Sequence, residues 1–127
     1  MSSRWSEFPR PIVPGRIVWA VPPSQRGMGK VRPLIVATRR IDILKGNPII
    51  VIACSAVFHE PLSPVEILLP FDQEGKGVTG LKADTIAVCD WIEAFPTGTK
   101  FKAGRMVPGP LLKTIFEAAG IKLPPER

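Results

Sequence analysis

The sequence is poor in the residues that cross-link a small protein or bind a metal ion. Its 127 residues include 2 cysteines, 1 histidine and no tyrosine. Cys54 and Cys89 each lie in an apolar run, where a free thiol usually serves as a small hydrophobic residue of the core. One histidine and two separated cysteines form no ligand set for zinc, and the scattered acidic residues lack the spacing of a calcium loop. We therefore expect no bound metal and no cofactor.

Long apolar runs are also missing. No stretch of the sequence reaches the about 20 apolar residues that a membrane-spanning helix requires. Residues 1–16 contain charges and prolines where a signal peptide would have an apolar centre. These absences predict a soluble, cytoplasmic protein without a membrane segment.

Positive charge is what the chain has in excess. Its 17 lysines and arginines outnumber its 11 aspartates and glutamates, which gives a formal net charge of +6. Such a surface favours nucleic acids, acidic membranes or acidic proteins as partners. A length of 127 residues, of which 45% are hydrophobic, matches one ordinary domain with a buried core.

Prolines and glycines interrupt the chain throughout. With 15 prolines and 11 glycines, long helices are excluded over most of the sequence, and short strands joined by turns remain. The segments rich in β-branched and other apolar residues are 16–21, 34–38, 49–53, 66–69 and 85–91. We expect each of these to form a strand.

Only the end of the chain has apolar residues at helical spacing. They are Leu111, Leu112, Ile115, Phe116 and Ala119. Pro110 suits the first turn of such a helix, and Gly120 suits its C-cap. Five or more antiparallel strands followed by one helix predict a mainly β fold with a C-terminal helix, in which a small curved sheet or half-open barrel is capped on one side.

Three segments, in this order and at this spacing, resemble the MazF/PemK family of toxins. Residues 14–19 (PGRIVW), a glycine-bearing loop and residues 30–36 (KVRPLIV) resemble the opening strand, the catalytic loop and the Arg-Pro strand of that family. Residues 50–55 (IVIACS) resemble the strand that ends in a hydroxyl-bearing residue. Residues 80–91 (GLKADTIAVCDW) and 104–107 (GRMV) resemble the Cys-Asp strand and the segment that closes the barrel.

The resemblance covers about residues 14–121 and leaves residues 1–13 as an N-terminal extension of a single domain. It implies an SH3-like, half-open antiparallel barrel, which this family shares with the CcdB-type gyrase toxins. It also implies the toxin of a type II toxin–antitoxin system. Such a toxin is a homodimeric endoribonuclease that cuts single-stranded RNA, including mRNA, without a metal, inhibits growth and is silenced by a cognate antitoxin.

Cutting RNA without a metal requires a proton acceptor, a proton donor and a cation that stabilises the phosphorane. Arg32 matches the family's Arg-Pro position and is the candidate cation, because a guanidinium binds phosphate oxygens at two points. Ser55 stands where the family has a threonine, and its hydroxyl either contacts a phosphate or forms a local turn. Asp90 matches an aspartate near the scissile bond and is the candidate proton acceptor, with a salt bridge or turn cap as the alternative.

The loop of residues 24–30 is the candidate RNA-binding segment. It carries Arg26 and Lys30 among glycines, which suits a lid that holds a nucleic-acid backbone while bases stack on Trp19 or Trp91. A plain surface hairpin is the alternative reading of the same loop.

The chain departs from the family pattern at two places. Val88 stands where the family has a second cation, and residues 26–29 replace the histidine or serine–glutamate pair of its loop. His59, the sole histidine, matches no family site. These departures favour an alternative function, a catalytically eroded barrel that binds RNA, an antitoxin or DNA gyrase. A peptide-binding SH3-like domain would require an aromatic-rich groove, and 6 phenylalanines with 3 tryptophans make that reading the weakest.

Overall fold

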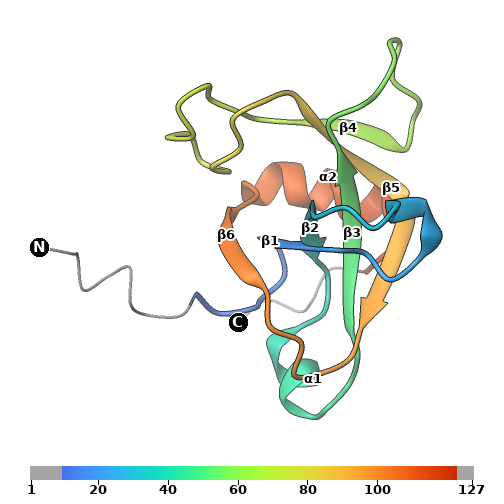
Figure 1. The fold of residues 1–127 in the computed structure, drawn as a ribbon, viewed down its shortest axis with the longest axis vertical. Helices are drawn as coiled ribbons and strands as arrows, with labels where there is room; N and C mark the ends of the chain where they lie inside the picture. The colour runs from blue at the N-terminus through green and yellow to red at the C-terminus, as the bar shows by residue number, and fades with distance from the viewer. Residues whose placement is uncertain (1–9, 123–127) are drawn as a thin grey trace, which may run out of the picture.

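The computed structural model describes residues 10–122, which form one curved sheet with its connections and a C-terminal helix (Figure 1). The strands are β1 (Arg16–Ala20), β2 (Arg32–Val36), β3 (Ile49–Ser55), β4 (Glu66–Leu69), β5 (Thr85–Phe95) and β6 (Lys102–Met106). They lie in the order β4-β5-β3-β2-β1-β6, and every neighbouring pair is antiparallel. The helical elements are a short 3-10 turn, η2 (Gln25–Gly27), and the helices α1 (Arg40–Leu44) and α2 (Gly109–Ala119). Most of the expected N-terminal extension, residues 1–9, lies outside the described residues.

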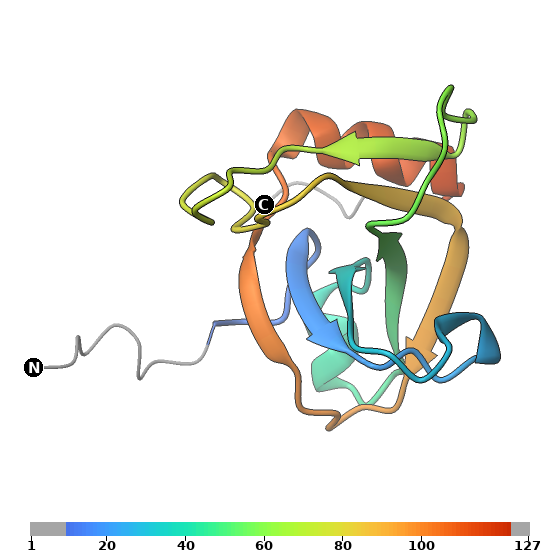
Figure 2. The same cartoon turned by 45° about the horizontal axis from the view of Figure 1, so that its top comes forward.

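The sheet bends into a half-open barrel, which Figure 2 shows with β6, β1, β2, β3 and β5 following one another around it. Side chains alternate between its two faces along each strand, so the sheet has two hydrophobic core clusters. On β2, Ile35 belongs to the first cluster, whereas Leu34 and Val36 belong to the second. Helix α2 covers the first cluster with Ile115 and Phe116, both fully buried.

A wide bulge interrupts the pairing of β5 with β3. Ile52 is paired with Ile92 and Cys54 with Ala87, so the single residue Ala53 faces four residues of β5. Val88 and Trp91 therefore both belong to the second cluster, although they are an odd number of positions apart. Between them the chain turns Asp90 outward into solvent. A β-bulge re-aims side chains in this way, and here it separates an exposed carboxylate from a buried indole.

The expected mainly β fold with a C-terminal helix is confirmed. The helix ends as expected, because Gly120 adopts φ +74°, a left-handed conformation that closes the last turn. The strand expected at 34–38 begins earlier, at Arg32, since Pro33 is paired with Trp19 inside the strand.

Two strands differ from the sequence-based expectation. The strand expected at 85–91 continues to Phe95, because the pairing with β3 resumes after the bulge. Strand β6 has no apolar alternation of its own, and its pairing with β1 holds it in the sheet. No helix in the described part of the chain is both long and apolar enough to cross a membrane.

The two cysteines are free thiols in the core, as expected. Burial raises the pKa of the Cys54 thiol strongly. Burial and the neighbouring Asp90 carboxylate together raise the pKa of Cys89 to about 11. Both groups are therefore inert hydrophobic residues at neutral pH.

Candidate active site

Trp91 is the centre of a cluster of charged side chains. Its side chain is only 6% exposed, yet two guanidinium groups lie over its ring, that of Arg26 at 4.7 Å and that of Arg32 at 5.5 Å from the ring centroid. Cations at such distances are attracted by the electron-rich face of an indole. The ring thus holds two positive charges from two separate segments, η2 and β2, at one place.

Arg32 is directed to this place by the strand that carries it. It is paired with Ala20 of β1, and it lies on the same face of β2 as Leu34 and Val36, which is the face of the second core cluster. Its Nε donates a hydrogen bond of 3.1 Å to the carbonyl oxygen of Gly27. That bond uses Nε and neither of the two terminal nitrogens, which are the guanidinium donors that can bind a phosphate.

Arg26 lies in the compact turn η2. The next residue, Gly27, packs on Pro22 so closely that a Cβ would come within 2.9 Å of the proline ring. Met28 then adopts φ 56°, and its N–H donates to the Gln25 carbonyl oxygen at 2.9 Å. Residues 25–28, within the loop for which a lid and a surface hairpin were both open, form a tight turn that presents Arg26.

Asp90 completes the charged cluster from the bulge of β5. Its Oδ1 lies 4.0 Å from a terminal nitrogen of Arg26, and both side chains are more than half exposed. An exposed ion pair at this separation is weak, about 0–1 kcal/mol, so another anion can compete for Arg26. The structure thus brings together Arg26, Arg32, Asp90 and Trp91.

Glu93 underlies the cluster and was not among the sequence-based candidates. It is 7% exposed, and its carboxylate accepts hydrogen bonds from the hydroxyl and the backbone N–H of Ser24 and, at 2.7 Å, from Nε1 of Trp91. Burial by itself raises the pKa of Glu93, but these hydrogen bonds and the nearby Arg26 outweigh burial and lower it. Glu93 therefore ties the start of the β1–β2 loop to β5 and fixes the orientation of the indole.

The sequence did contain a signal for Glu93. It lies two residues after Trp91 and two before Phe95, so all three side chains point to the buried face of β5. A charged residue in a buried position of a strand requires partners, and such a residue is a candidate for a structural or functional role.

Among the described residues, no hydrogen bond or ion pair joins Ser55 or Lys30 to the four residues of the cluster. The Ser55 hydroxyl accepts a hydrogen bond from the N–H of Val57 at 3.1 Å and donates one of 3.0 Å to the carbonyl oxygen of the same residue. This is the local turn that the sequence left open as an alternative. The pairing of β2 with β3 ends with Leu34 and Ala53. Ser55, two residues beyond Ala53, and Arg32, two residues before Leu34, therefore lie at the same end of the two strands. Lys30 is exposed.

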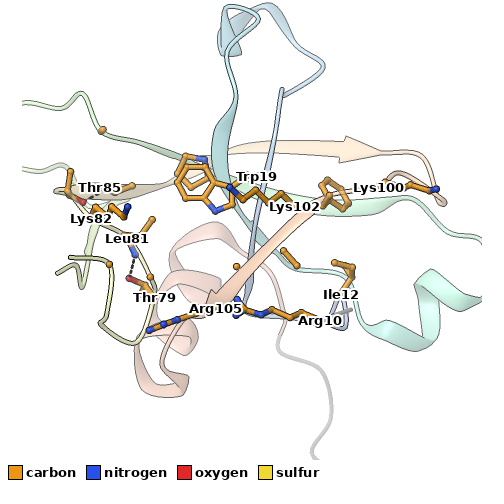
Figure 3. A pocket seen from close by; sticks show the side chains of 18 of the residues that line it. Arg10, Ile12, Trp19, Thr79, Leu81, Lys82, Thr85, Lys100, Lys102 and Arg105 are labelled. Atoms are coloured by element: carbon orange, nitrogen blue, oxygen red, sulfur yellow. Dashed lines mark hydrogen bonds between the residues drawn. The ribbon is translucent and has the colours of Figure 1, made fainter. Parts of the chain in front are cut away.

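Trp19 is also apart from the cluster, because it lies on the opposite face of the sheet. It packs against the first core cluster, whereas Trp91 belongs to the second. Its indole lines an open cavity beside β6 (Figure 3).

Two further positions bear on the chemistry. Val88, which stands where the MazF/PemK family has a second cation, is 6% exposed and packs in the second core cluster. His59 is exposed in the connection between β3 and β4. Among residues 10–122, no three histidine, cysteine, aspartate or glutamate side chains come together as a metal site.

Comparison with known proteins gives matches in structure only. No protein-family profile matches the sequence, and no curated protein matches it significantly. The structure is similar to that of MazF from Deinococcus radiodurans, with a TM-score of 0.67 and 15% identity over 88% of this chain and 96% of that chain. A chain of the MazE–MazF complex of the same organism gives a TM-score of 0.64 at 13% identity, covering 88% of this chain and 94% of that chain.

A third similar structure is the Mycobacterium tuberculosis toxin MazF-mt6, with a TM-score of 0.60 and 17% identity over 84% of this chain and 92% of that chain. Structural similarity at identities this low establishes the fold alone, and the chemistry must be argued from the residues. The protein has the MazF/PemK-like fold.

Proposed function

We propose that this protein is the toxin of a type II toxin–antitoxin system and an endoribonuclease that cuts single-stranded RNA, mRNA included, without a metal. The observation that carries the proposal is the cluster on Trp91, where two guanidinium groups and a carboxylate meet at the surface. Growth inhibition would follow from the loss of mRNA.

The cluster supplies groups that RNA cleavage requires. The 2′-hydroxyl of the RNA attacks the adjacent phosphorus and gives its proton to the Asp90 carboxylate. Arg32 and Arg26 stabilise the negative charge that grows on the phosphorane oxygens. The bond to the 5′-oxygen then breaks, that oxygen takes up a proton from water, Asp90 returns its proton to water, and the products are a 2′,3′-cyclic phosphate and a 5′-hydroxyl.

Substrate binding itself prepares this step. A phosphate that approaches the cluster competes with Asp90 for Arg26, because their pair is exposed and 4.0 Å long. Asp90 is then released to accept a proton. The indole of Trp91 is too buried, at 6% exposure, to stack on a base, so we assign it to support the two arginines.

The proposed partners are a second copy of the chain and a cognate antitoxin. The similar Deinococcus structures include complexes named MazE–MazF, and a chain with a net charge of +6 suits an acidic partner. The candidate contacts of a homodimer are the terminal helix and the strand edge near Trp91 and Phe95. Both aromatic side chains are 6% exposed, and α2 buries Ile115 and Phe116 within its own subunit, so a dimer contact in these regions would use neighbouring exposed side chains such as Ile92.

The direct test is to incubate the purified protein with a long single-stranded RNA in excess EDTA. Wild-type protein should shorten the RNA, and Arg32→Ala should not. Arg40→Ala is the matched control, because it removes one exposed arginine from α1, beyond the opposite end of β2. Circular dichroism should show that both variants are folded. Intact RNA after incubation with wild-type protein would refute the nuclease.

A second candidate function is an eroded barrel that binds RNA, an antitoxin or gyrase without cutting. Two observations favour it: Val88 fills the core where a cation would be required, and the Ser55 hydroxyl is occupied by Val57. In that case the protein would bind a 2′-O-methyl RNA, which lacks a free 2′-hydroxyl, and would also bind unmodified RNA without cutting it.

A further inference from the structure

A cavity of about 1090 Å³ opens between β6 and the loop that joins β4 to β5. Strands β4 and β6 are the two edges of the sheet, so the cavity lies in the gap of the half-open barrel. Its volume exceeds the about 300–1,000 Å³ of most small-molecule pockets. The cavity is therefore large enough to admit a stretch of an extended polymer.

The walls of the cavity are held in place by hydrogen bonds. A terminal nitrogen of Arg105, on β6, donates to the carbonyl oxygen of Gly77 in the β4–β5 loop at 2.7 Å. Within that loop, the Thr79 hydroxyl donates to the Pro70 carbonyl oxygen at 2.6 Å and accepts from the N–H of Leu81 at 3.2 Å. The cavity is thus a formed feature of the fold.

An indole and several cations face this space. Figure 3 shows Trp19 in the wall of the cavity, with Lys82, Lys102 and Arg105 around it. The indole lies beside Gly104 of β6: a Cβ at that glycine would come 3.4 Å from Nε1 of Trp19 and, more tightly, 3.1 Å from the backbone oxygen of Ile17.

The charge of the lining is of one sign. Five of its described residues are cationic, and none is acidic. They are Arg10, Lys82, Lys100, Lys102 and Arg105. Five like charges around one hollow repel one another, which favours the binding of a polyanion.

We propose that this cavity is a second RNA-binding surface, which holds a stretch of single-stranded RNA away from the cluster on Trp91. Lys82, Lys102 and Arg105 contact phosphates, and a base stacks on Trp19. Cations around a flat ring match the phosphates and the bases of a single strand. The inference rests on the proposed RNA substrate but not on its cleavage.

The test measures binding without cleavage. A fluorescein-labelled 2′-O-methyl RNA of about 12 nucleotides is titrated with the protein at several salt concentrations, and its anisotropy is recorded. The double variant Lys82→Ala/Lys102→Ala should weaken binding about tenfold and lower the salt slope by about 1.4, because each phosphate contact to a single strand contributes about 0.7. Arg40→Ala/Lys45→Ala removes the same charge from the exposed α1 region and should change binding less than threefold.

Trp19 distinguishes RNA from other anions. Trp19→Leu should weaken RNA binding about fivefold or more, while Trp19→Phe, which keeps a ring, should weaken it less. A polyglutamate peptide is the probe for an acidic protein partner. If that peptide needs both lysines, is indifferent to Trp19→Leu and is not displaced by RNA, the cavity binds acidic protein and the proposal is overturned.

The outcomes for the cavity and for the nuclease are separable. RNA binding that survives Lys82→Ala/Lys102→Ala unchanged would overturn the cavity proposal, whatever the protein does to RNA. Binding that depends on both lysines and on Trp19, in a protein that cuts no RNA, would support the cavity and refute the nuclease. Should Trp19→Leu fail to fold, the surface lysine variants still decide the question.

Discussion

Trp91 and Trp19 occupy opposite faces of one sheet, and their surroundings differ in charge. Trp91 is buried beneath two arginines, its Nε1 donates to a carboxylate, and another carboxylate lies beside it. Trp19 lines an open cavity whose described charged residues are all cationic. A site with both a carboxylate and arginines can accept a proton and stabilise an anion. A cavity lined only by cations can bind an anion but offers no carboxylate to accept a proton.

Under the proposed function, RNA would be cleaved beside Trp91 and only bound beside Trp19. Around Trp91 the hydrogen bonds of Glu93 fix the positions of the loop and the indole, as a reacting site requires. Around Trp19 the cations are exposed lysines and arginines, which suit contacts that carry no sequence information. Substitutions on the two sides should therefore affect different measurements.

The largest expected effect belongs to Arg32. Arg32→Ala should lower the rate of RNA cleavage by about 10² to 10³, because it removes the stabilisation of the phosphorane. Lys102→Ala, on the cavity side, should lower the same rate less than tenfold when RNA is saturating. Single-turnover kinetics on one RNA measures both. Equal losses in the two variants would erase the distinction between the two regions.

Asp90→Asn should slow cleavage by about 10² while leaving stability unchanged within about 0.5 kcal/mol, since the exposed pair with Arg26 contributes little to folding. Cleavage rates and urea unfolding, recorded on one preparation, give both values. Glu74→Gln is the control, because it neutralises an exposed carboxylate that is paired with Lys76 in the β4–β5 loop. A destabilised but fully active Asp90→Asn protein would make Asp90 a structural residue.

Glu93→Gln should lower the free energy of unfolding at pH 7 by about 1–3 kcal/mol, because an amide nitrogen replaces one of the two acceptor oxygens and the hydrogen bonds from Ser24 and Trp91 cannot all be kept. The folded protein holds the pKa of Glu93 below its ordinary value of about 4.3. Its stabilisation is therefore present above that pH and is lost as the pH falls through the lowered pKa.

The difference in stability between wild-type protein and Glu93→Gln should accordingly shrink on acidification below about pH 4. Urea unfolding between neutral pH and about pH 3 measures it. A difference that stays constant over this range would show that the charge of Glu93 does not stabilise the fold.

The smallest expected effect is that of Ser55→Ala. Its hydroxyl is engaged with Val57, so the substitution should slow cleavage less than threefold and cost about 0.5–1.5 kcal/mol in stability. A loss of activity as large as that of Arg32→Ala would mean that the hydroxyl leaves its turn and contacts the phosphate, as the resemblance implied.

The fold could be predicted because its signals are local. Prolines and glycines bound the apolar segments, and the spacing from Leu111 to Ala119 predicts the terminal helix that is observed. Strand β6 was harder to predict, because Lys102–Met106 has no apolar alternation and depends on its pairing with β1. Pairing with a strand that is distant in the sequence need not produce any pattern within the segment itself.

The sequence-based candidates included four residues of the site, but neither Glu93 nor the way in which the residues come together was predicted. Arg26, Arg32, Asp90 and Trp91 were all named from the sequence, but the bulge opposite Ala53, which turns Asp90 outward and Trp91 inward, follows from pairing with β3. Residue type alone also cannot distinguish the faces on which the two tryptophans lie. A one-position change in strand phase exchanges the two faces.

The most direct test of the central claim is to identify the ends of the RNA fragments that form in excess EDTA. A site made of two arginines and a carboxylate should release 2′,3′-cyclic phosphate and 5′-hydroxyl ends, with no dependence on a divalent metal. Cleavage that stops in EDTA and returns with magnesium, or fragments that carry 5′-phosphates, would contradict it.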